Sequence, residues 1–331
     1  MANRTTLKDV ARAAGVSQMT VSRVVRGDTV VSLRTREHVE RVIGNMGYVP
    51  NKLAGSLARA HSNQVAVLIP SLVNNVYTSV LAGITEGLER GGYNPVVGVT
   101  EYDLQKEEAQ LISMMSWRPA AVILANLVHT DRTRSILENT PVPVVEIMDI
   151  SGDPIDLCVG LDHEAAAATL ADYLMERGYR RFGYLGWQTN DFVAAARFRA
   201  FRARLETRGY GLVAPDVYDA PPDMPAGKKG LEMLLSVAPK TEAVAYSNDT
   251  AAMGGVNLCL ELGMRIQDDL AIAGFSGLRM AQCLPQPLTT IRTRRRDIGK
   301  TAARNVLKRL SGTPVERKVD FGFELLKGQS A

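Results

Sequence analysis

Four side chains close to the N-terminus have the chemistry needed to read the edges of DNA bases. They lie on the outer face of a helix expected to follow Ser17, and they are Gln18, Met19, Ser22 and Arg23. In the major groove an arginine pairs with guanine, a glutamine pairs with adenine, and an apolar side chain contacts the methyl group of thymine. The inner face of the same helix is apolar and consists of Val21, Val24 and Val25. The segment therefore predicts a helix that presents base-reading groups to a groove.

Two short helices joined by a tight turn would hold these side chains in place. Thr6 and Asp9 have the spacing of a capping box, which places the start of the first helix at Thr6. Gly15 is expected to end that helix, and Ser17 is a good cap for the second. Small residues at the crossing would let the two helices approach closely, which is typical of a helix-turn-helix. An ordinary helical hairpin is the alternative, because such patterns are short and degenerate.

The stretch TLKDVARAAGVSQMTVSRVV resembles the start of the lac and galactose repressor family of bacterial transcription regulators. The similarity continues through VSLRTREHVERVIGNMGYVPNKLAGSLA, where Ser32 can cap a third helix. A DNA-binding domain is thus expected at residues 1–50, and four polar residues, Thr6, Ser17, Ser32 and Asn51, are expected to contact phosphates. The full set of expected DNA contacts is Thr6, Ser17, Gln18, Met19, Thr20, Ser22, Arg23, Ser32, Asn51, Ala54 and Leu57.

A hinge helix and linker are expected at residues 51–62. Asn51 can cap a helical segment from Lys52 to Ala58, but so few residues cannot hold a helix alone in water, and we expect disorder away from DNA. Gly55 lowers the helix propensity further, by about 1 kcal/mol relative to alanine. The resemblance implies a hinge helix that folds against its dimer mate on DNA, with Leu57 separating the central base step as a minor-groove wedge. A packing role for Leu57 in a linker is the alternative.

The charge of the chain is unevenly distributed. Residues 1–61 hold 10 Lys+Arg against 4 Asp+Glu, or +6, whereas the remaining residues hold 29 against 31, or −2. A basic segment gains affinity for DNA by releasing the counterions condensed on phosphates. Taken alone the excess also fits a solvated basic face. Its coincidence with the helix-turn-helix pattern favours a DNA-binding head on a near-neutral body.

From Val65 onward, short apolar runs alternate with helical patterns, which is typical of parallel sheets built from β-α-β units. The runs VAVLIP, NPVVGVT, AAVILA and VPVVEI form one series, and RRFGYLG, TEAVAYS and DLAIAGF form a second. Helices are expected near 78–91, 104–116, 130–138, 163–177, 192–208, 226–237 and 250–262. The expected fold class is α/β, with a three-helix head and a larger body of parallel sheets. A chain of 331 residues is long enough for such an arrangement.

The resemblance implies that residues 63–331 form a hinged, two-lobed clamshell like that of the periplasmic sugar-binding proteins. It places chain crossings near residues 161, 291 and 322, and a helix at 294–310 that returns to the first lobe. Lobe one would then comprise about 63–161 and 292–322. Lobe two would comprise about 162–291 and 323–331.

Polar residues at the ends of the expected strands could bind a small-molecule effector in the cleft between the lobes. Arg197 matches by motif the arginine that anchors the effector in the resembling family, and Asn248 with Asp249 matches its paired Asn-Asp. The expected effector-binding residues are Ser71, Glu146, Arg197, Asn248, Asp249 and Ser276. The alternative is that Ser71 and Asn248 cap helices and that Arg197 lies at the surface.

One departure from the family pattern bears on the effector. Many sugar-binding relatives place an acidic residue after the glycine-aromatic pair, whereas the sequence GFSG has Ser276 there. A missing carboxylate would tolerate an anionic ligand. The segments VVEIMD, DLAIAGFSG and VDFGFELLKG resemble the gluconate repressor branch more than the lac repressor, so the leading hypothesis for the effector is a sugar acid. The densest charge run of the body, Arg294 to Arg296, fits a solvated helix start or an anion contact.

No enzyme activity, metal ion or cofactor is expected. The four histidines, His38, His61, His129 and His163, have no metal-ligand spacing to one another or to cysteines. A Rossmann glycine fingerprint, a Walker A loop and a G-x-S-x-G elbow are all missing from the sequence. An α/β enzyme remains the rival class, and turnover of a candidate sugar would revive it.

The expected compartment is the cytoplasm, with association to the nucleoid when DNA is bound. The three cysteines, Cys158, Cys259 and Cys283, lie in apolar runs and fit free thiols in a reducing compartment. Neither an export signal nor a membrane-spanning run is seen, which disfavours a membrane partner or an exported solute-binding protein. The expected partners are double-stranded operator DNA, a sugar or sugar-acid effector and a second copy in a homodimer. Induction is the leading mode of control, and corepression is the alternative.

Overall fold

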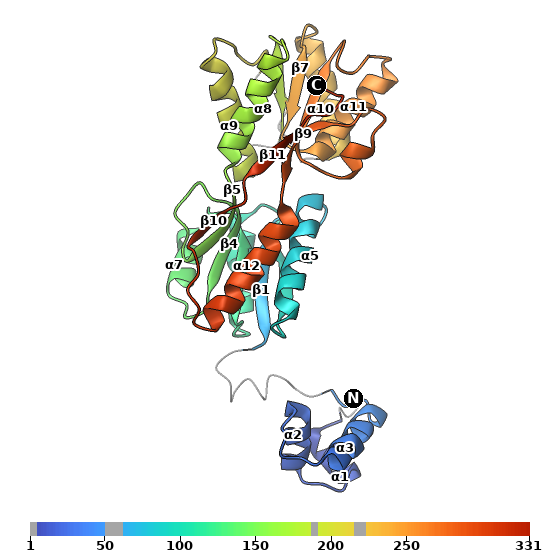
Figure 1. The fold of residues 1–331 in the computed structure, drawn as a ribbon, viewed down its shortest axis with the longest axis vertical. Coiled ribbons are helices and arrows are strands. Elements are labelled where there is room, and N and C mark those ends of the chain that lie inside the picture. The colour runs from blue at the N-terminus through green and yellow to red at the C-terminus, as the bar shows by residue number, and fades with distance from the viewer. Residues whose placement is uncertain (1–4, 50–61, 187–190, 215–222) are drawn as a thin grey trace. The chain divides into compact units, whose positions relative to one another are not determined.

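The computed structural model describes residues 5–49, 62–186, 191–214 and 223–331 (Figure 1). The chain divides into two compact units, Met1–Ser62 and Asn63–Ala331. The expected hinge residues Asn51, Ala54 and Leu57 lie outside the described residues.

The first unit is a bundle of three helices, α1 (Leu7–Ala13), α2 (Gln18–Arg26) and α3 (Leu33–Asn45). Six fully buried apolar side chains form its core: Val10, Ala11, Ala14, Val21, Val24 and Val39. The capping box of Thr6 and Asp9 and the cap at Ser17 are confirmed. The prediction that Val25 points inward is wrong, because 37% of this side chain is exposed. So small a core covers Val21 and Val24 but not a third valine near the end of α2.

The second unit contains two sheets, and the first has the strand order β10-β5-β4-β3-β1-β2. Its strands β1 to β5 are parallel, as expected for β-α-β units. The elements in chain order are β1 (Gln64–Ile69), α5 (Asn75–Glu89), β2 (Asn94–Val99), α6 (Leu104–Met115), β3 (Ala121–Ala125), α7 (Asp131–Glu138), β4 (Val144–Asp149) and β5 (Leu157–Leu161).

The second sheet has the strand order β11-β9-β8-β7-β6, and only β11 runs antiparallel to its neighbour. It is built from α8 (His163–Glu176), β6 (Phe182–Leu185), α9 (Phe192–Glu206), α10 (Met224–Val237), β7 (Ala243–Tyr246), α11 (Asp249–Glu261), β8 (Ala271–Ser276), the short helix η1 (Met280–Cys283) and β9 (Thr289–Thr293). All the apolar runs predicted to be strands are strands.

The chain passes between the two sheets three times, after β5, after β9 and after β10. After β9 it forms α12 (Arg295–Leu310), which packs against α5 of the first sheet, and then β10 (Lys318–Asp320). It returns as β11 (Phe323–Leu326) beside β9. Figure 1 shows α12, drawn in red, alongside α5, drawn in cyan.

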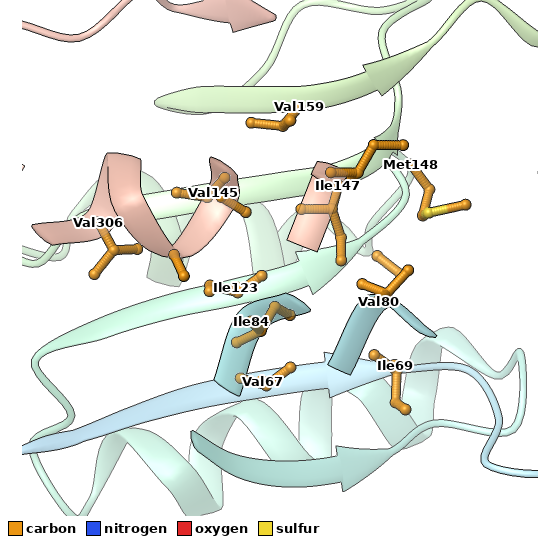
Figure 2. Packing of buried hydrophobic residues seen from close by; sticks show 14 of the residues in the cluster. Val67, Ile69, Val80, Ile84, Ile123, Val145, Ile147, Met148, Val159 and Val306 are labelled. Atoms are coloured by element: carbon orange, nitrogen blue, oxygen red, sulfur yellow. The ribbon is translucent and has the colours of Figure 1, made fainter. Parts of the chain in front are cut away.

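The core of the first sheet explains why α5 and α12 are so close. Side chains from β1, β3, β4 and β5 meet Val80 and Ile84 of α5 and Val306 of α12 (Figure 2). Glycines bring the two helix backbones together, since a Cβ built on Gly83 would lie 2.1 Å from the Arg296 carbonyl oxygen. A side chain larger than glycine would therefore force the helices apart. No described helix is long and apolar enough to cross a membrane.

Candidate functional site

The outer face of α2 presents the predicted base-reading side chains. Gln18, Met19 and Arg23 are exposed, and Met19 retains 58% of its accessible surface. Thr20 and Ser22 are half-buried on the same helix. The helix start is rigidly defined, because the Ser17 hydroxyl accepts from the Thr20 amide at 3.1 Å. These side chains therefore project from a fixed helix into solvent, where a major groove could meet them.

The other described DNA-contact candidates are helix caps in the head. The Thr6 amide and hydroxyl donate to Asp9 Oδ2 at 3.0 and 2.6 Å, and these bonds, with burial opposing, lower the pKa of Asp9. The Ser32 hydroxyl accepts from the Thr35 amide at 3.3 Å. Both caps are exposed, and so they can also approach phosphates.

A small cavity lies between the two sheets of the second unit. Residues of both halves line it: Asn74, Val76, Tyr77, Met148, His163, Asp191, Val193, Arg197, Ser247, Asn248 and Ser276. The space open to the centre of a water molecule is about 20 Å³, enough for roughly one water. Ligand pockets are usually about 300 to 1,000 Å³. A bound ligand must therefore widen this cavity by moving its side chains or the two halves.

Arg197 of α9 is held in the cavity by three contacts. Its Nε donates to His163 Nδ1 at 3.1 Å, and its Nη1 donates to the Ser247 carbonyl at 2.9 Å. The guanidinium also lies 4.0 Å from the centre of the Phe275 ring, a cation–π contact. Burial lowers the pKa of Arg197, which nevertheless stays cationic. Three partners thus fix the direction in which its remaining N–H groups can bind a ligand.

His163, at the start of α8, connects Arg197 to the first sheet. Its Nε2 donates to the carbonyl of Met148 at 2.8 Å, so its Nδ1 is free of a proton and accepts from Arg197. Burial, and then the charge of Arg197, holds the pKa of His163 well below its usual value. The imidazole is therefore neutral and in a single tautomer. Met148, whose carbonyl accepts this hydrogen bond, has a φ of 82°, a conformation uncommon for a side-chain-bearing residue.

Two family descriptions match this chain and identify the family to which it belongs. Residues 6–51 match the bacterial regulatory proteins of the lacI family, and residues 62–321 match the periplasmic binding proteins and sugar binding domain of the LacI family. The chain belongs to the LacI family. The HTH-type transcriptional regulator GntR of Escherichia coli strain K12 is 33% identical over 331 residues, covering 99% of this chain and 98% of that protein.

Solved structures of LacI family members agree with the fold. A transcriptional regulator of the family from Silicibacter pomeroyi has a TM-score of 0.93 at 39% identity, covering 98% of this chain and 99% of its own. The lac repressor dimer bound to operator and an anti-inducer has a TM-score of 0.83, at 23% identity over 99% of both chains, which shows a shared fold. The protein is thus a transcriptional regulator with a helix-turn-helix head and a two-lobed α/β ligand-binding domain.

In this LacI family member the cavity includes three of the six predicted effector residues. Arg197, Asn248 and Ser276 line it. The Asn248 side chain also caps α11, accepting from the Ala251 amide at 2.8 Å. Ser276 has a φ of 124°, which is strained for a residue other than glycine. The structure therefore places Arg197 in the cavity rather than at the surface, while Asn248 combines a cavity position with the capping role.

Ser71 does not line the cavity. Its hydroxyl accepts from the amides of Val73 and Asn74, both at 3.1 Å, and so organises the turn that leads into α5. Asn74, which the turn positions, does line the cavity and donates through Nδ2 to the Tyr102 hydroxyl at 3.0 Å. Ser71 therefore has the capping role that was the alternative for it, and Asn74 occupies the cavity position, while an effector contact of Ser71 stays a prediction.

Glu146 also lies away from the cavity, in a buried ionic cluster with His129 and Glu107. His129 Nδ1 is 2.6 Å from Glu107 Oε1, and its Nε2 is 3.2 Å from Glu146 Oε1. Burial lowers the pKa of His129, but the hydrogen bonds to Glu107 and Glu146 outweigh it and raise that pKa to about 9. Glu146 Oε2 accepts from the Ile155 amide at 2.6 Å. Glu146 therefore holds a loop in place and does not line this cavity, and its effector role stays a prediction.

Asp249 is fully buried beneath the end of β8. Its Oδ2 accepts from the Leu278 amide at 2.6 Å, and its Oδ1 accepts from the Thr290 hydroxyl at 2.5 Å. Burial raises its pKa to about 6 even though these hydrogen bonds oppose the shift. Asp249 therefore supports the segment that carries Ser276 and does not line the cavity, and its effector role stays a prediction.

Sequence reasoning missed several cavity residues. Asp191 caps α9 by accepting from the amides of Val193 and Ala194, and burial raises its pKa despite the nearby charge of Arg197. Tyr77, on the first turn of α5, is buried beside it. Asp191 stands immediately before a helical pattern, so the sequence did contain a signal for it as a cap. No group of three or more His, Cys, Asp or Glu side chains in the described ranges could hold a metal ion.

Proposed function

We propose that this LacI family protein is a homodimeric repressor of sugar or sugar-acid catabolic genes that a gluconate-like effector releases from its operator. The observation that carries the proposal is the oriented guanidinium of Arg197 in a small cavity between two sheets. Its N–H groups suit a carboxylate or a diol. The similarity to GntR and the serine at position 276 support an anionic ligand over a neutral sugar.

On the DNA side, residues 1–50 act as the reading head and residues 51–62 as the hinge. Two copies of α2 enter successive major grooves about one helical turn apart on a pseudo-palindromic operator. Arg23 reads a guanine, Gln18 an adenine, and Met19 a thymine methyl. Leu57 inserts into the minor groove from the hinge, and the polar candidates Thr6, Ser17, Ser32 and Asn51 hold phosphates.

On the effector side, residues 63–331 bind the ligand. Arg197 binds the carboxylate or a vicinal diol, and Asn248, Ser276 and Asn74 bind further hydroxyl groups. Because the unliganded cavity has room for little more than a water, the ligand stabilises a wider arrangement of the two halves. The difference in affinity between the two arrangements is what shifts the equilibrium of DNA binding. The protein acts in the cytoplasm and catalyses no reaction on the effector.

The test measures operator affinity with and without ligand. Genome-wide mapping of bound sites supplies the operator sequence, and its neighbouring genes indicate the metabolite. Fluorescence anisotropy of labelled operator with full-length protein then follows titration with gluconate, related sugar acids and neutral sugars. Release by a sugar acid supports the proposal. If a sugar acid tightens operator binding, the mode of control is corepression and not induction. If operator binding responds to no sugar acid, this class of effector is excluded.

A further inference from the structure

Three consecutive arginines at the start of α12 have entirely different surroundings. Arg294 is exposed, pairs with Asp297 at 3.0 Å and lies 5.6 Å from the centre of the Phe321 ring. Arg296 reaches Glu86 on α5 at 3.2 Å. Arg295 is only 9% exposed, which is rare for a charged side chain unless it has strong partners. The middle arginine therefore has a role that its two neighbours do not share.

Arg295 binds the segment that follows β8. Its Nη1 donates to the Ser276 carbonyl and its Nη2 to the Gly277 carbonyl, the latter at 3.3 Å. The Nε of Arg295 is buried without a hydrogen-bond partner in the described part of the chain. Leaving a buried donor unpaired costs free energy, so the two carbonyl contacts must be strong enough to hold the side chain there.

The bound segment is strained and belongs to the cavity wall. Ser276 lines the cavity with a φ of 124°, and Gly277 follows with a φ of 66°. On its amide side the segment is held by Asp249 and Thr290, since the Leu278 amide donates to the former and the Gly277 amide to the latter. A strained conformation persists only when its surroundings over-determine it. Arg295 supplies that constraint on the carbonyl side.

The backbone of Arg295 belongs to the opposite half of the domain. Beyond Arg295, α12 packs its buried face on the first sheet and on α5. A Cβ built on Gly299 would lie 2.1 Å from the Val80 carbonyl oxygen, so the helices touch backbone to backbone. Glu86 of α5 also pairs with Lys300 of α12. The first turn of α5 and the residue before it carry Tyr77 and Asn74, which line the other wall of the cavity.

We propose that Arg295 is a positioning residue that ties the cavity-lining Ser276–Gly277 segment of the second sheet to the α5–α12 helix pair of the first. The inference takes the identity of the ligand from the proposed function. The two hydrogen bonds from Arg295 to the Ser276 and Gly277 carbonyls, which we call the clasp, are present without ligand. When a ligand moves Ser276, the clasp moves Arg295 and rotates the α5–α12 helix pair. Conversely, a rotation of this helix pair moves Ser276. Arg295 is thus where ligand occupancy and the angle between the halves are coupled.

The first experiment needs no ligand. Hydrogen–deuterium exchange is measured on the full chain for the wild type, Arg295→Met and the matched control Arg294→Met. Loss of the clasp should speed exchange of the Gly277 and Leu278 amides about ten- to hundredfold, the equilibrium equivalent of a hydrogen bond to a charged group. Peptides from β3 and β7 should exchange at wild-type rates, and Arg294→Met should match the wild type throughout.

Arg295→Lys is a second variant, which keeps the test valid if Arg295→Met does not fold. Lysine keeps the charge and one donor, and so this variant should show acceleration confined to the same two amides and smaller than with methionine. Unchanged exchange at Gly277 and Leu278 would overturn the proposal. Acceleration spread evenly over both sheets would also overturn it, because that result describes a residue that only stabilises the fold.

The second experiment measures coupling, with gluconate as the probe. Operator affinity without ligand should be the same within about twofold for the wild type and Arg295→Met. The ratio of operator affinities with and without gluconate, typically about 5- to 150-fold in allosteric proteins, should fall toward one in Arg295→Met. If Arg295→Met keeps the wild-type ratio, Arg295 does not couple ligand binding to operator binding. If the wild type itself ignores gluconate, the effector assignment fails, while the exchange measurement still decides the role of Arg295.

Discussion

Arg23 in the head and Arg197 in the cavity are the same residue type in opposite surroundings. Arg23 projects into solvent from α2, whereas Arg197 is held by His163, Ser247 and the ring of Phe275 before any ligand arrives. An exposed arginine loses side-chain entropy when it binds, whereas a pre-oriented one has already lost it on folding. On the proposed function, we therefore expect the head to adapt to the surface of DNA and the cavity to select a ligand by its shape.

The head and the cavity also differ in charge. The head carries a net positive charge in water, where salt screens it, and the body is near neutral. The charged residues of the cavity, Asp191 and Arg197, are half-buried, and desolvation raises the pKa of Asp191 while lowering that of Arg197. Interactions in such a place are screened much less than those at a surface. The comparison thus predicts that salt, mutation and pH act on the two regions to different extents.

Salt should produce the largest difference. If a dimer neutralises about 6 to 10 phosphates, operator affinity should fall about 10³- to 10⁵-fold between 50 and 200 mM salt, linearly on a log-log plot. Affinity for the effector in the cavity should change by less than about threefold over the same range, because buried charges are poorly screened. Anisotropy and calorimetric titrations measure the two. A flat salt response of operator binding would contradict a phosphate-binding head.

Replacing Arg197 should have the next largest effect. Arg197→Met removes the donor to the effector and leaves His163 Nδ1 and the Ser247 carbonyl unpaired, at about 1 to 3 kcal/mol for each buried group. Effector affinity should fall at least a hundredfold, while operator affinity without effector is retained. Arg199→Met is the matched control, because Arg199 is exposed on the same helix. Similar losses in both variants would mean that Arg197 is not the anchor.

The sequence predicted the helix caps and the exposed face of α2 more accurately than it predicted which residues line the cavity, for a physical reason. Helix caps and apolar periodicity are local signals, so Thr6, Ser17 and the face of α2 could be placed from neighbours within four residues. The cavity depends on long-range contacts. Nothing near position 163 in the sequence indicates that His163 accepts a hydrogen bond from a guanidinium 34 residues later.

Side-chain direction explains why Glu146 and Asp249 do not line the cavity. Glu146 is on a strand that leads to the cavity, but its side chain meets His129 and Glu107, a contact that strand alternation cannot foretell. Asp249 follows Asn248, which lines the cavity, yet the first turn of α11 directs Asp249 toward the Leu278 amide. The strands β5, β9, β10 and β11 were not predicted, and in β9 and β10 polar residues interrupt the apolar run. Position along the chain was therefore predictable, and direction was not.

The buried cluster around His129 gives the body a pH dependence that the head should lack. The pKa of His129 is about 9 in the folded chain against an ordinary value of 6.5. The stabilisation is therefore fully present below about pH 6.5 and is lost as the pH rises through about 9. At about 1.4 kcal/mol per pKa unit, the second unit should lose on the order of 2 to 3 kcal/mol of unfolding free energy across that window.

Urea unfolding of the full chain at pH 6.5, 7.5 and 9.5 measures this loss. His129→Gln should be less stable at pH 6.5 and should vary little with pH over the same window. His38→Gln is the control, because that exposed side chain lies in the head and contacts only the Ala14 carbonyl among its described partners. A wild-type body whose stability is constant from pH 6.5 to 9.5 contradicts the ionic cluster.

The smallest effect should come from Arg23→Ala, and it should also be the most selective. Loss of a bidentate contact to guanine costs about 1 to 3 kcal/mol on the cognate operator and little on random DNA. Arg26→Ala is the comparison on the same helix, since Arg26 donates to the Ser22 carbonyl of its own helix at 3.3 Å. It should weaken both DNAs equally and slightly, by lowering the positive charge of the head. Equal losses of affinity on both DNAs with Arg23→Ala would mean that this arginine contacts a phosphate and not a base. The distinction between an adaptable reading surface and a selective cavity would then rest on Gln18 and Met19.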